Sequence, residues 1–180
     1  MPGSERVRHG LTSTRLPGRR ADGARLQVFV SRIYVSTVID ASPDDVWRVV
    51  EPVERHVDWM ADAVAIRFET DQTRGVGTQF LCDTKVGPLR LVDRMEITEW
   101  DPGRTMGVRH TGLVTGTGRF TIERAVGSGT LFAWEEDLRF PWWMGGPVGE
   151  LVGGRLVLRQ IWKRNLRALK ALVERAPAPA

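Results

Sequence analysis

The sequence contains a single cysteine, Cys82, so no disulfide can form within its 180 residues. Scarce cysteine is typical of proteins from a reducing compartment. No apolar run approaches the roughly 18 residues that a membrane-spanning helix needs, so we expect no integral membrane segment. Arg19-Arg20 is no export signal, because Arg25 and Arg32 interrupt any apolar core that could follow. These absences predict a cytoplasmic protein.

Motifs that would identify a metal or cofactor site are also missing. His56 and His110 are the histidines of the expected folded body, and no short-spaced pair of His or Cys ligands occurs. Gly75-Val76-Gly77 and Gly116-Thr117-Gly118 lack the third glycine and the strand-to-helix context of a dinucleotide site, so we interpret them as strand-boundary glycines. No serine lies in a GxSxG elbow. We therefore expect neither a metal nor a cofactor.

The net charge of +4 has a local origin. Residues 1–25 carry six arginines against two acidic residues, and the rest of the chain balances 20 basic with 20 acidic residues. A nucleic-acid footprint on the folded body is therefore not expected. Gly, Pro, Ser, Thr and Arg dominate the start of the chain, which ends in APAPA. We predict a disordered basic arm over 1–27, a domain over 28–174 and a disordered tail over 175–180.

The domain begins with a predicted strand and two short helices. Residues 31–40 are rich in β-branched side chains and alternate as a strand does. Ser42 and Pro43 then form a helix start, with Asp44 and Asp45 in the first turn, where the helix dipole favours negative charge. Pro52 separates this helix from a second one at about 53–60.

The middle of the chain predicts an antiparallel meander. Between residues 63 and 140 six short alternating segments are separated by turn sequences such as GP, DPGR and VGSG, with no helical pattern between them. The last element, about 147–174, has an apolar face repeating every three or four residues and a basic face that we interpret as solvated. The predicted fold is α+β: a curved antiparallel sheet of about seven strands wrapped around a long C-terminal helix.

Several segments carry a family resemblance. YVSTVIDASPDDVWRVV, WM at 59–60, GVGTQF at 75–80, EITEWDPGRTM at 96–106 and the final WKRNLRALKALVE resemble the START-like, Bet v 1-like superfamily (SRPBCC), which includes polyketide cyclases, aromatase/cyclases and lipid-transport proteins. The resemblance spans about 31–174. It implies a helix-grip fold with a largely apolar cavity between the sheet and the C-terminal helix, and it brings no catalytic motif with it.

Strand alternation then identifies polar residues that face this cavity. The apolar phase of their strands places Asp93, His110 and Glu136 on the inner face. Two acids and an imidazole in an apolar pocket could polarise or deprotonate a keto or phenolic substrate, so we consider them candidate catalytic residues. A β-bulge would reverse the phase of any of these strands, and a residue near a strand end could simply reach solvent.

Apolar side chains are the candidates for ligand contact. They are the large residues expected on the inner face, the last helix or the connection before it: Trp59, Phe80, Met95, Met106, Phe120, Trp134, Trp142, Trp143, Met144, Leu158 and Trp162. In RFPWWMGGPVGE we expect Trp142 or Trp143 to line the cavity entrance, with Met144 as adaptable filler, although simple packing is an equal alternative.

Two functions remain open. One is binding of a hydrophobic small molecule, such as a lipid, polyketide or other aromatic compound. The alternative is a cyclase, aromatase or dehydratase that uses the same cavity, with proton transfer by the inward polar residues. We favour binding, because few polar residues face the predicted cavity. Binding of nucleic acid or membrane by the basic arm is a distant third, and the oligomeric state has no signature in the sequence.

Overall fold

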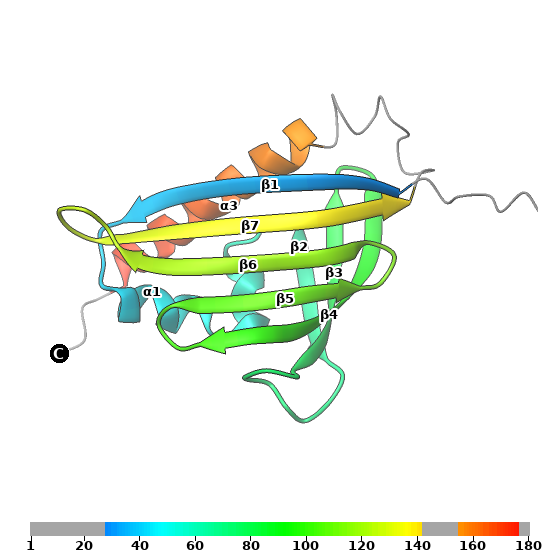
Figure 1. Cartoon of the computed structure of the whole chain (residues 1–180), viewed down its shortest axis with the longest axis horizontal. Helices are drawn as coiled ribbons and strands as arrows, with labels where there is room; N and C mark the ends of the chain where they lie inside the picture. The colour runs from blue at the N-terminus through cyan, green and yellow to red at the C-terminus, as the bar shows by residue number, and fades with distance from the viewer. Residues whose placement is uncertain (1–27, 142–154, 177–180) are drawn as a thin grey trace, which may run out of the picture.

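The computed structural model describes residues 28–141 and 155–176. In chain order (Figure 1) the elements are β1 (Val28–Ile39), α1 (Pro43–Val50), the 3₁₀ helix η1 (Val53–Asp58), β2 (Ala63–Phe68), β3 (Gln79–Val86), β4 (Leu89–Asp101), β5 (Thr105–Thr111), β6 (Thr115–Arg124), β7 (Thr130–Pro141) and α3 (Arg155–Arg175).

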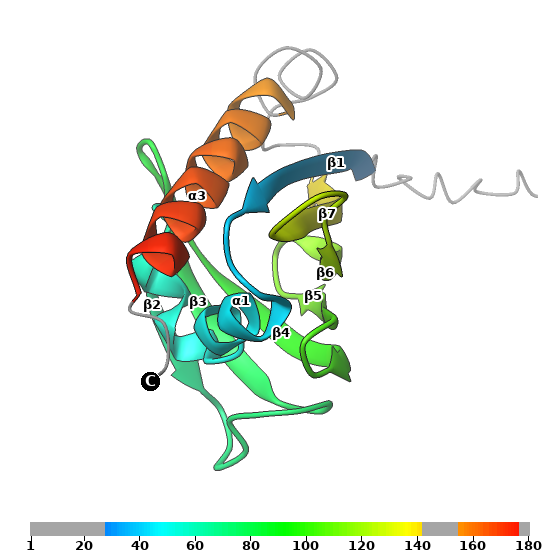
Figure 2. The same cartoon turned by 90° about the vertical axis from the view of Figure 1, so that its left-hand side faces the viewer.

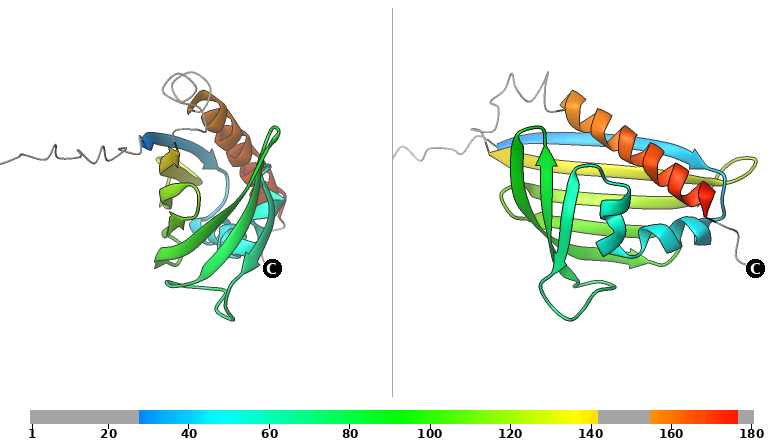
Figure 3. Two further views of the ribbon diagram at one scale, coloured as in Figure 1. Left: turned by 90° about the vertical axis from the view of Figure 1, so that its right-hand side faces the viewer. Right: turned by 180° about the vertical axis from the view of Figure 1, so that it is seen from behind.

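The seven strands form one antiparallel sheet. Their order is β1-β7-β6-β5-β4-β3-β2, so β2 to β7 are a meander and β1 joins it beside β7. The β1–β7 pairing runs from Val28 opposite Pro141 to Ile39 opposite Thr130. The sheet curves strongly (Figure 2), and β2 and β3 run crosswise to β1 and β7 (Figure 3). The predicted antiparallel sheet of about seven strands is confirmed.

The first helix starts where the sequence predicted. The Ser42 side chain accepts a hydrogen bond from the Asp45 backbone N–H, the Asp45 side chain accepts one in return from the Ser42 backbone, and Pro43 occupies the first turn. The second short helix is a 3₁₀ helix of six residues that follows Pro52. It is shorter than the predicted span of about 53–60. Helix α1 lies toward one end of the curved sheet, and η1 follows it toward β2 (Figure 3).

Helix α3 covers the concave face of the sheet (Figures 2 and 3). Its buried stripe consists of Trp162, Asn165, Leu166, Leu169 and Val173. Two hydrogen bonds hold the C-terminal part of α3 against the end of β1. Lys170 Nζ donates to the Val38 carbonyl at 2.6 Å, and Glu174 Oε1 accepts from the backbone N–H of Asp40, the residue after β1, at 2.8 Å. The helix ends at Arg175, the first residue of the predicted tail. A long C-terminal helix gripped by a curved sheet is the helix-grip fold that we predicted.

The two faces of the sheet differ in chemistry. The inner face contributes apolar side chains to a single core with α1, η1 and α3. The outer face carries cross-strand ion pairs between arginines and carboxylates, including Arg32–Asp137, Arg67–Asp83, Arg109–Glu96 and Arg119–Glu99. A bulge in β4 between Ile97 and Glu99 changes the phase only after Ile97. Asp93, Met95 and Ile97 therefore share the inner face, as alternation requires.

Several predictions lie outside the described residues: the disordered arm over 1–27, the end of the tail, the segment with Trp142, Trp143 and Met144, and the helix start near Pro147. Within the two described ranges, no helix combines the length and apolar composition that crossing a bilayer requires.

Candidate functional site

The three inward polar residues form one buried cluster. His110 Nδ1 lies 2.5 Å from Asp93 Oδ2, and His110 Nε2 lies 3.2 Å from Glu136 Oε2. The exposed fractions of Asp93, His110 and Glu136 are 6%, 8% and 5%. The structure thus places a buried imidazole between two buried carboxyl groups, on the side of the sheet that faces α3.

Three different strands supply the cluster. Asp93 lies on β4, His110 on the neighbouring β5, and Glu136 on β7, which is separated from β5 by β6. Glu136 is paired with Gly118 of β6, and His110 is paired with Gly116. Glu136 and His110 therefore approach each other across a part of β6 that presents no side chain on the inner face.

Gly118 provides the space that Glu136 occupies. A Cβ atom at this position would lie 2.5 Å from Glu136 Oε1 and 2.8 Å from Glu136 Cδ, closer than real Cβ contacts come. Any residue other than glycine would displace the carboxylate. We interpreted Gly116 and Gly118 as strand-boundary residues; Gly116 is the second residue of β6, whereas Gly118 lies further inside the strand and has a positioning role that its sequence context does not indicate.

The carboxylates determine the charge of the histidine. Burial by itself lowers the pKa of His110, but the hydrogen bond with Asp93 and the contact with Glu136, together with their negative charges, outweigh it and raise the pKa to about 10. The imidazole is therefore protonated at neutral pH, and both ring nitrogens carry hydrogen. Two carboxyl groups thus flank a single imidazolium.

Several polar atoms of the site have no hydrogen-bond partner. Glu136 Oε1 accepts a hydrogen bond from Trp134 Nε1 at 2.8 Å, but Glu136 Oε2, Asp93 Oδ1 and His110 Nε2 are buried without one. His110 Nε2 and Glu136 Oε2 are close enough for an ion pair, although the ring N–H is not aligned with the oxygen for a hydrogen bond. Leaving such groups unpaired costs about 1–3 kcal/mol each, so a ligand that paired with them would gain affinity.

An aromatic wall adjoins the cluster through Trp134. The ring centroid of Trp134 lies 5.3 Å from Phe120, 6.1 Å from Trp59 and 5.2 Å from Trp162 of α3. Trp59 Nε1 is a further buried donor without a partner. Four of the predicted ligand-contact residues thus come from η1's C-cap, β6, β7 and α3 and meet at one place, next to Glu136.

The remaining predicted ligand-contact residues are divided between the core and its margin. Met106 and Phe80 are buried, whereas Met95 and Leu158 are partly buried and pack against the same core. Met95 is paired in register with both Phe80 of β3 and His110 of β5, which places it beside the cluster. Trp142, Trp143 and Met144 lie outside the described residues, so their predicted place at the entrance remains a prediction.

Two other titratable groups on the inner side are neutral. His56 is buried, its Nε2 lies 2.6 Å from the Val50 carbonyl, and burial lowers its pKa to about 4. Cys82, paired with Asp93 across β3 and β4, is also buried, and burial raises the pKa of its thiol to about 11. In the described part of the chain, no group of three or more His, Cys, Asp or Glu side chains could hold a metal ion.

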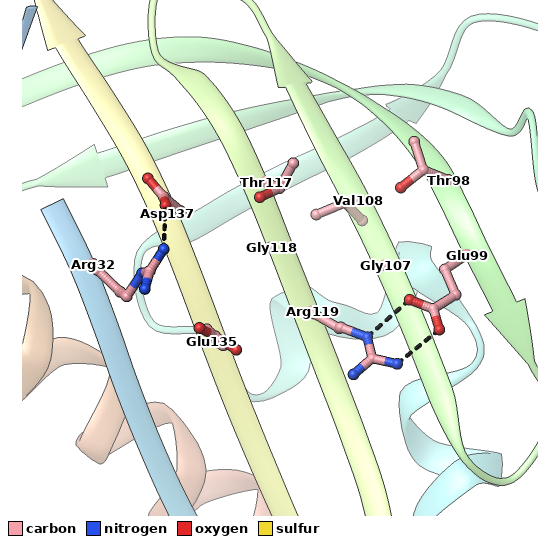
Figure 4. Close-up of a pocket in the computed structure, with 10 residues that line it drawn as sticks. All are labelled: Arg32, Thr98, Glu99, Gly107, Val108, Thr117, Gly118, Arg119, Glu135 and Asp137. Carbon is pink, nitrogen blue, oxygen red and sulfur yellow. Dashed lines mark hydrogen bonds and ion pairs between the residues drawn. The ribbon is translucent and has the colours of Figure 1, made fainter. Parts of the chain in front are cut away.

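The outer face of the sheet carries a hollow of about 330 Å³. Its lining (Figure 4) consists of Arg32, Thr98, Glu99, Gly107, Val108, Thr117, Gly118, Arg119, Glu135 and Asp137. The two arginines are already paired, Arg32 with Asp137 at 3.2 Å and Arg119 with Glu99 at 2.8 Å. Since both of its arginines are already engaged by exposed carboxylates, this hollow is a weaker candidate than the buried cluster on the inner face.

Comparisons with known proteins agree with the class that the fold defines, a helix-grip protein. A sequence model of the family described as polyketide cyclase / dehydrase and lipid transport matches residues 31–174. The chain belongs to this family, and with it to the START-like (SRPBCC) superfamily. No curated protein sequence shows significant similarity to the chain.

Solved structures share the fold at low sequence identity. A START superfamily protein from Mycobacterium smegmatis aligns with a TM-score of 0.65 and 14% identity over 79% of this chain and 97% of that one. The Zhui aromatase/cyclase from Streptomyces sp. R1128 aligns with a TM-score of 0.62 and 18% identity over 82% and 95%. The di-domain ARO/CYC StfQ of the steffimycin biosynthetic pathway aligns with a TM-score of 0.59 and 15% identity over 81% of this chain and 51% of that one. Identities this low show the common fold.

Proposed function

We propose that the protein binds a hydrophobic small molecule between the sheet and α3, with the Asp93–His110–Glu136 cluster touching the polar group of that molecule. The observation that carries the proposal is the buried cluster itself, whose Asp93 Oδ1 and Glu136 Oε2 have no hydrogen-bond partner. The aromatic wall of Trp59, Phe120, Trp134 and Trp162 supplies the apolar surface beside it. Pockets for small molecules typically combine such apolar walls with a few convergent polar groups.

Membership in the family supports a lipid, a polyketide or another aromatic compound as the ligand. Aromatic side chains suit such ligands, because their flat faces bury a large area against rings and alkyl chains. The protein would then sequester or carry its ligand without changing it.

Native mass spectrometry of the protein purified from its own cells tests this function. We expect a small molecule of defined mass to co-purify with the wild type and to be reduced or lost in His110→Phe, which removes the polar centre of the cluster. Glu99→Gln, on the outer face, is the matched control and should retain the molecule. A wild-type protein without any bound molecule, which also fails to take one up from a lipid extract, would contradict the proposal.

A second candidate function is catalysis of the cyclase, aromatase or dehydratase type. The observation that favours it is the imidazolium held between two carboxylates. In such a site His110 could hydrogen-bond to a ketone oxygen and stabilise the enolate, while a carboxylate removes the proton from the adjacent carbon. Two of the structural neighbours are described as aromatase/cyclases, which supports this alternative.

Separate measurements of affinity and conversion distinguish the two functions. If the protein is an enzyme, incubation with the co-purified ligand or its precursor yields a product that has lost water or closed a ring. Asp93→Asn and Glu136→Gln would then bind the compound with affinity similar to that of the wild type and convert it at least about 100-fold more slowly. Binding without conversion by the wild type leaves the carrier function.

A further inference from the structure

The cluster offers a ligand more free hydrogen-bond acceptors than free donors. Asp93 Oδ2 and Glu136 Oε1 are engaged by His110 Nδ1 and Trp134 Nε1. The sister oxygens, Asp93 Oδ1 and Glu136 Oε2, are buried hydrogen-bond acceptors without a partner. The single free donor of the cluster is the His110 Nε2–H. A ligand group that meets these atoms must therefore supply at least one hydrogen.

The surrounding charges disfavour an anion. Neither lysine nor arginine occurs among the buried residues of 32–141 and 156–176, the ranges for which burial is described. The His110 imidazolium is the positive charge at the cluster, and it already lies between two carboxyl groups. A ligand carboxylate placed beside Asp93 and Glu136 would lose its water, would bring no hydrogen for their free oxygens and would find no cation of its own.

We propose that the site selects an uncharged ligand through a hydroxyl group, phenolic or alcoholic, and rejects carboxylates such as free fatty acids. A hydroxyl fits both sides of the cluster, because its hydrogen can be donated to Glu136 Oε2 or Asp93 Oδ1 while its oxygen accepts from His110 Nε2. This inference rests on the proposed binding function and specifies the class of molecule that the site takes.

Two matched series of compounds test the selection. Naphthol, methoxynaphthalene and naphthoate share one ring system, and decanol, decyl methyl ether and decanoate share one chain length. Within each series the first compound carries a hydroxyl, the second only an acceptor, and the third an anion. Isothermal titration at neutral pH should show the hydroxyl compound binding at least about tenfold more tightly than the ether, and the carboxylate binding most weakly.

The variant Asp93→Asn/Glu136→Gln replaces both carboxyl groups by amides, which can donate hydrogen bonds, with little change of shape. We expect it to lose about tenfold or more of the discrimination against the carboxylate. Asp83→Asn/Glu99→Gln makes the same change of charge on the outer face and should discriminate as the wild type does. Circular dichroism spectra establish whether both variants are folded. If Asp93→Asn/Glu136→Gln does not fold, the affinities of the wild type for the hydroxyl, ether and carboxylate compounds test the inference.

The outcomes separate this inference from the function beneath it. A wild-type protein that binds the carboxylate as tightly as the hydroxyl compound, or the ether as tightly as either, has an apolar site but not the proposed selectivity, and the inference is wrong. If no member of either series binds, the proposed binding function fails, and the inference fails with it.

Discussion

At the scale of single residues, one glycine determines the geometry of the cluster. Glu136 reaches His110 across β6 only because Gly118 leaves the inner face of that strand empty. Glu136 is in turn held by Trp134 Nε1, so a strand, a glycine and an indole together position one carboxylate. A small change on β6 should therefore alter the surroundings of the imidazole on the neighbouring strand β5.

Gly118→Ala should lower the pKa of His110. The added methyl group occupies the space of the Glu136 carboxylate, which must move and loses its contact with His110 Nε2. With one carboxylate fewer beside it, the imidazolium is less stabilised, and we expect its pKa to fall from about 10 by about one pH unit or more. NMR titration of isotopically labelled histidine measures the pKa of His110 in each variant. Thr117→Ala, with its side chain on the outer face, is the control, and an unchanged titration in Gly118→Ala would show that Gly118 does not position Glu136.

The inward orientation of the three polar residues was predictable, but their mutual contacts were not. Alternation along β4, β5 and β7 identifies the inner face because the apolar neighbours of each residue must be buried. The distances depend on the order of the strands, on the bulge that falls after Ile97, and on the empty position at Gly118. The residue pattern of one strand indicates none of these features, because each depends on how neighbouring strands are paired.

At the scale of elements, a buried asparagine joins α3 to the segment that connects η1 with β2. Asn165 is fully buried, accepts a hydrogen bond from the Ala61 backbone N–H at 3.0 Å and donates one to Asp62 Oδ1 at 2.7 Å. A helix is held in place here by directional bonds as well as by its apolar stripe. This contact holds α3 against the segment that follows Trp59 of the aromatic wall.

Asn165→Ala should lower the free energy of unfolding by about 2–4 kcal/mol. The change leaves the Ala61 N–H without its acceptor and opens a gap in a fully buried position. Urea denaturation followed by circular dichroism measures the loss. Arg164→Ala, at the exposed neighbouring position of the helix, should change the stability by less than about 0.5 kcal/mol. Equal stabilities of the two variants would show that the Asn165 contacts contribute nothing.

The elements themselves were largely predictable from local signals. Ser42, Pro43 and the acidic first turn marked the start of α1, and turn sequences separated the strands of the meander. The 3₁₀ geometry of η1 was not predicted, because a six-residue segment after a proline has too few positions to show a helical period. The pairing of β1 with β7 is a long-range contact that follows from the family fold rather than from any residue pattern.

At the scale of the whole molecule, charged side chains are distributed unequally between the two faces of the sheet. Arginines and carboxylates of neighbouring strands pair on the outer face, where exposed ion pairs contribute little to stability. The inner side holds few titratable groups, and two of them, His56 and His110, have pKa values displaced in opposite directions. These two histidines should shape how stability depends on pH.

Stability should decline on both sides of about pH 6.5. His110 has a folded pKa of about 10 against 6.5 unfolded, so the folded state holds the extra proton and the stabilisation is lost as the pH rises through that window. His56 has a folded pKa of about 4, so the unfolded state takes up the proton and stability is lost as the pH falls from 6.5. Each group contributes at most about 1.4 kcal/mol per pH unit within its window.

Urea denaturation at a series of pH values from about 4 to about 10 measures both declines in stability, the acidic limb below pH 6.5 and the alkaline limb above it. Replacing His110 by phenylalanine should flatten the alkaline limb alone, and replacing His56 by phenylalanine the acidic limb alone. Alkaline limbs of equal slope in His110→Phe and the wild type would mean that His110 does not hold its proton in the folded protein.

The hydrogen bond from Trp134 to Glu136 gives the molecule a built-in reporter. An indole N–H that donates to a carboxylate has an NMR frequency that depends on the charge and position of that carboxylate. Trp134 also contacts Trp162 and Phe120, so the same side chain lies between the polar cluster and the apolar wall. The signal of one indole proton can therefore follow protonation of the cluster and arrival of a ligand in the native chain, without any attached label.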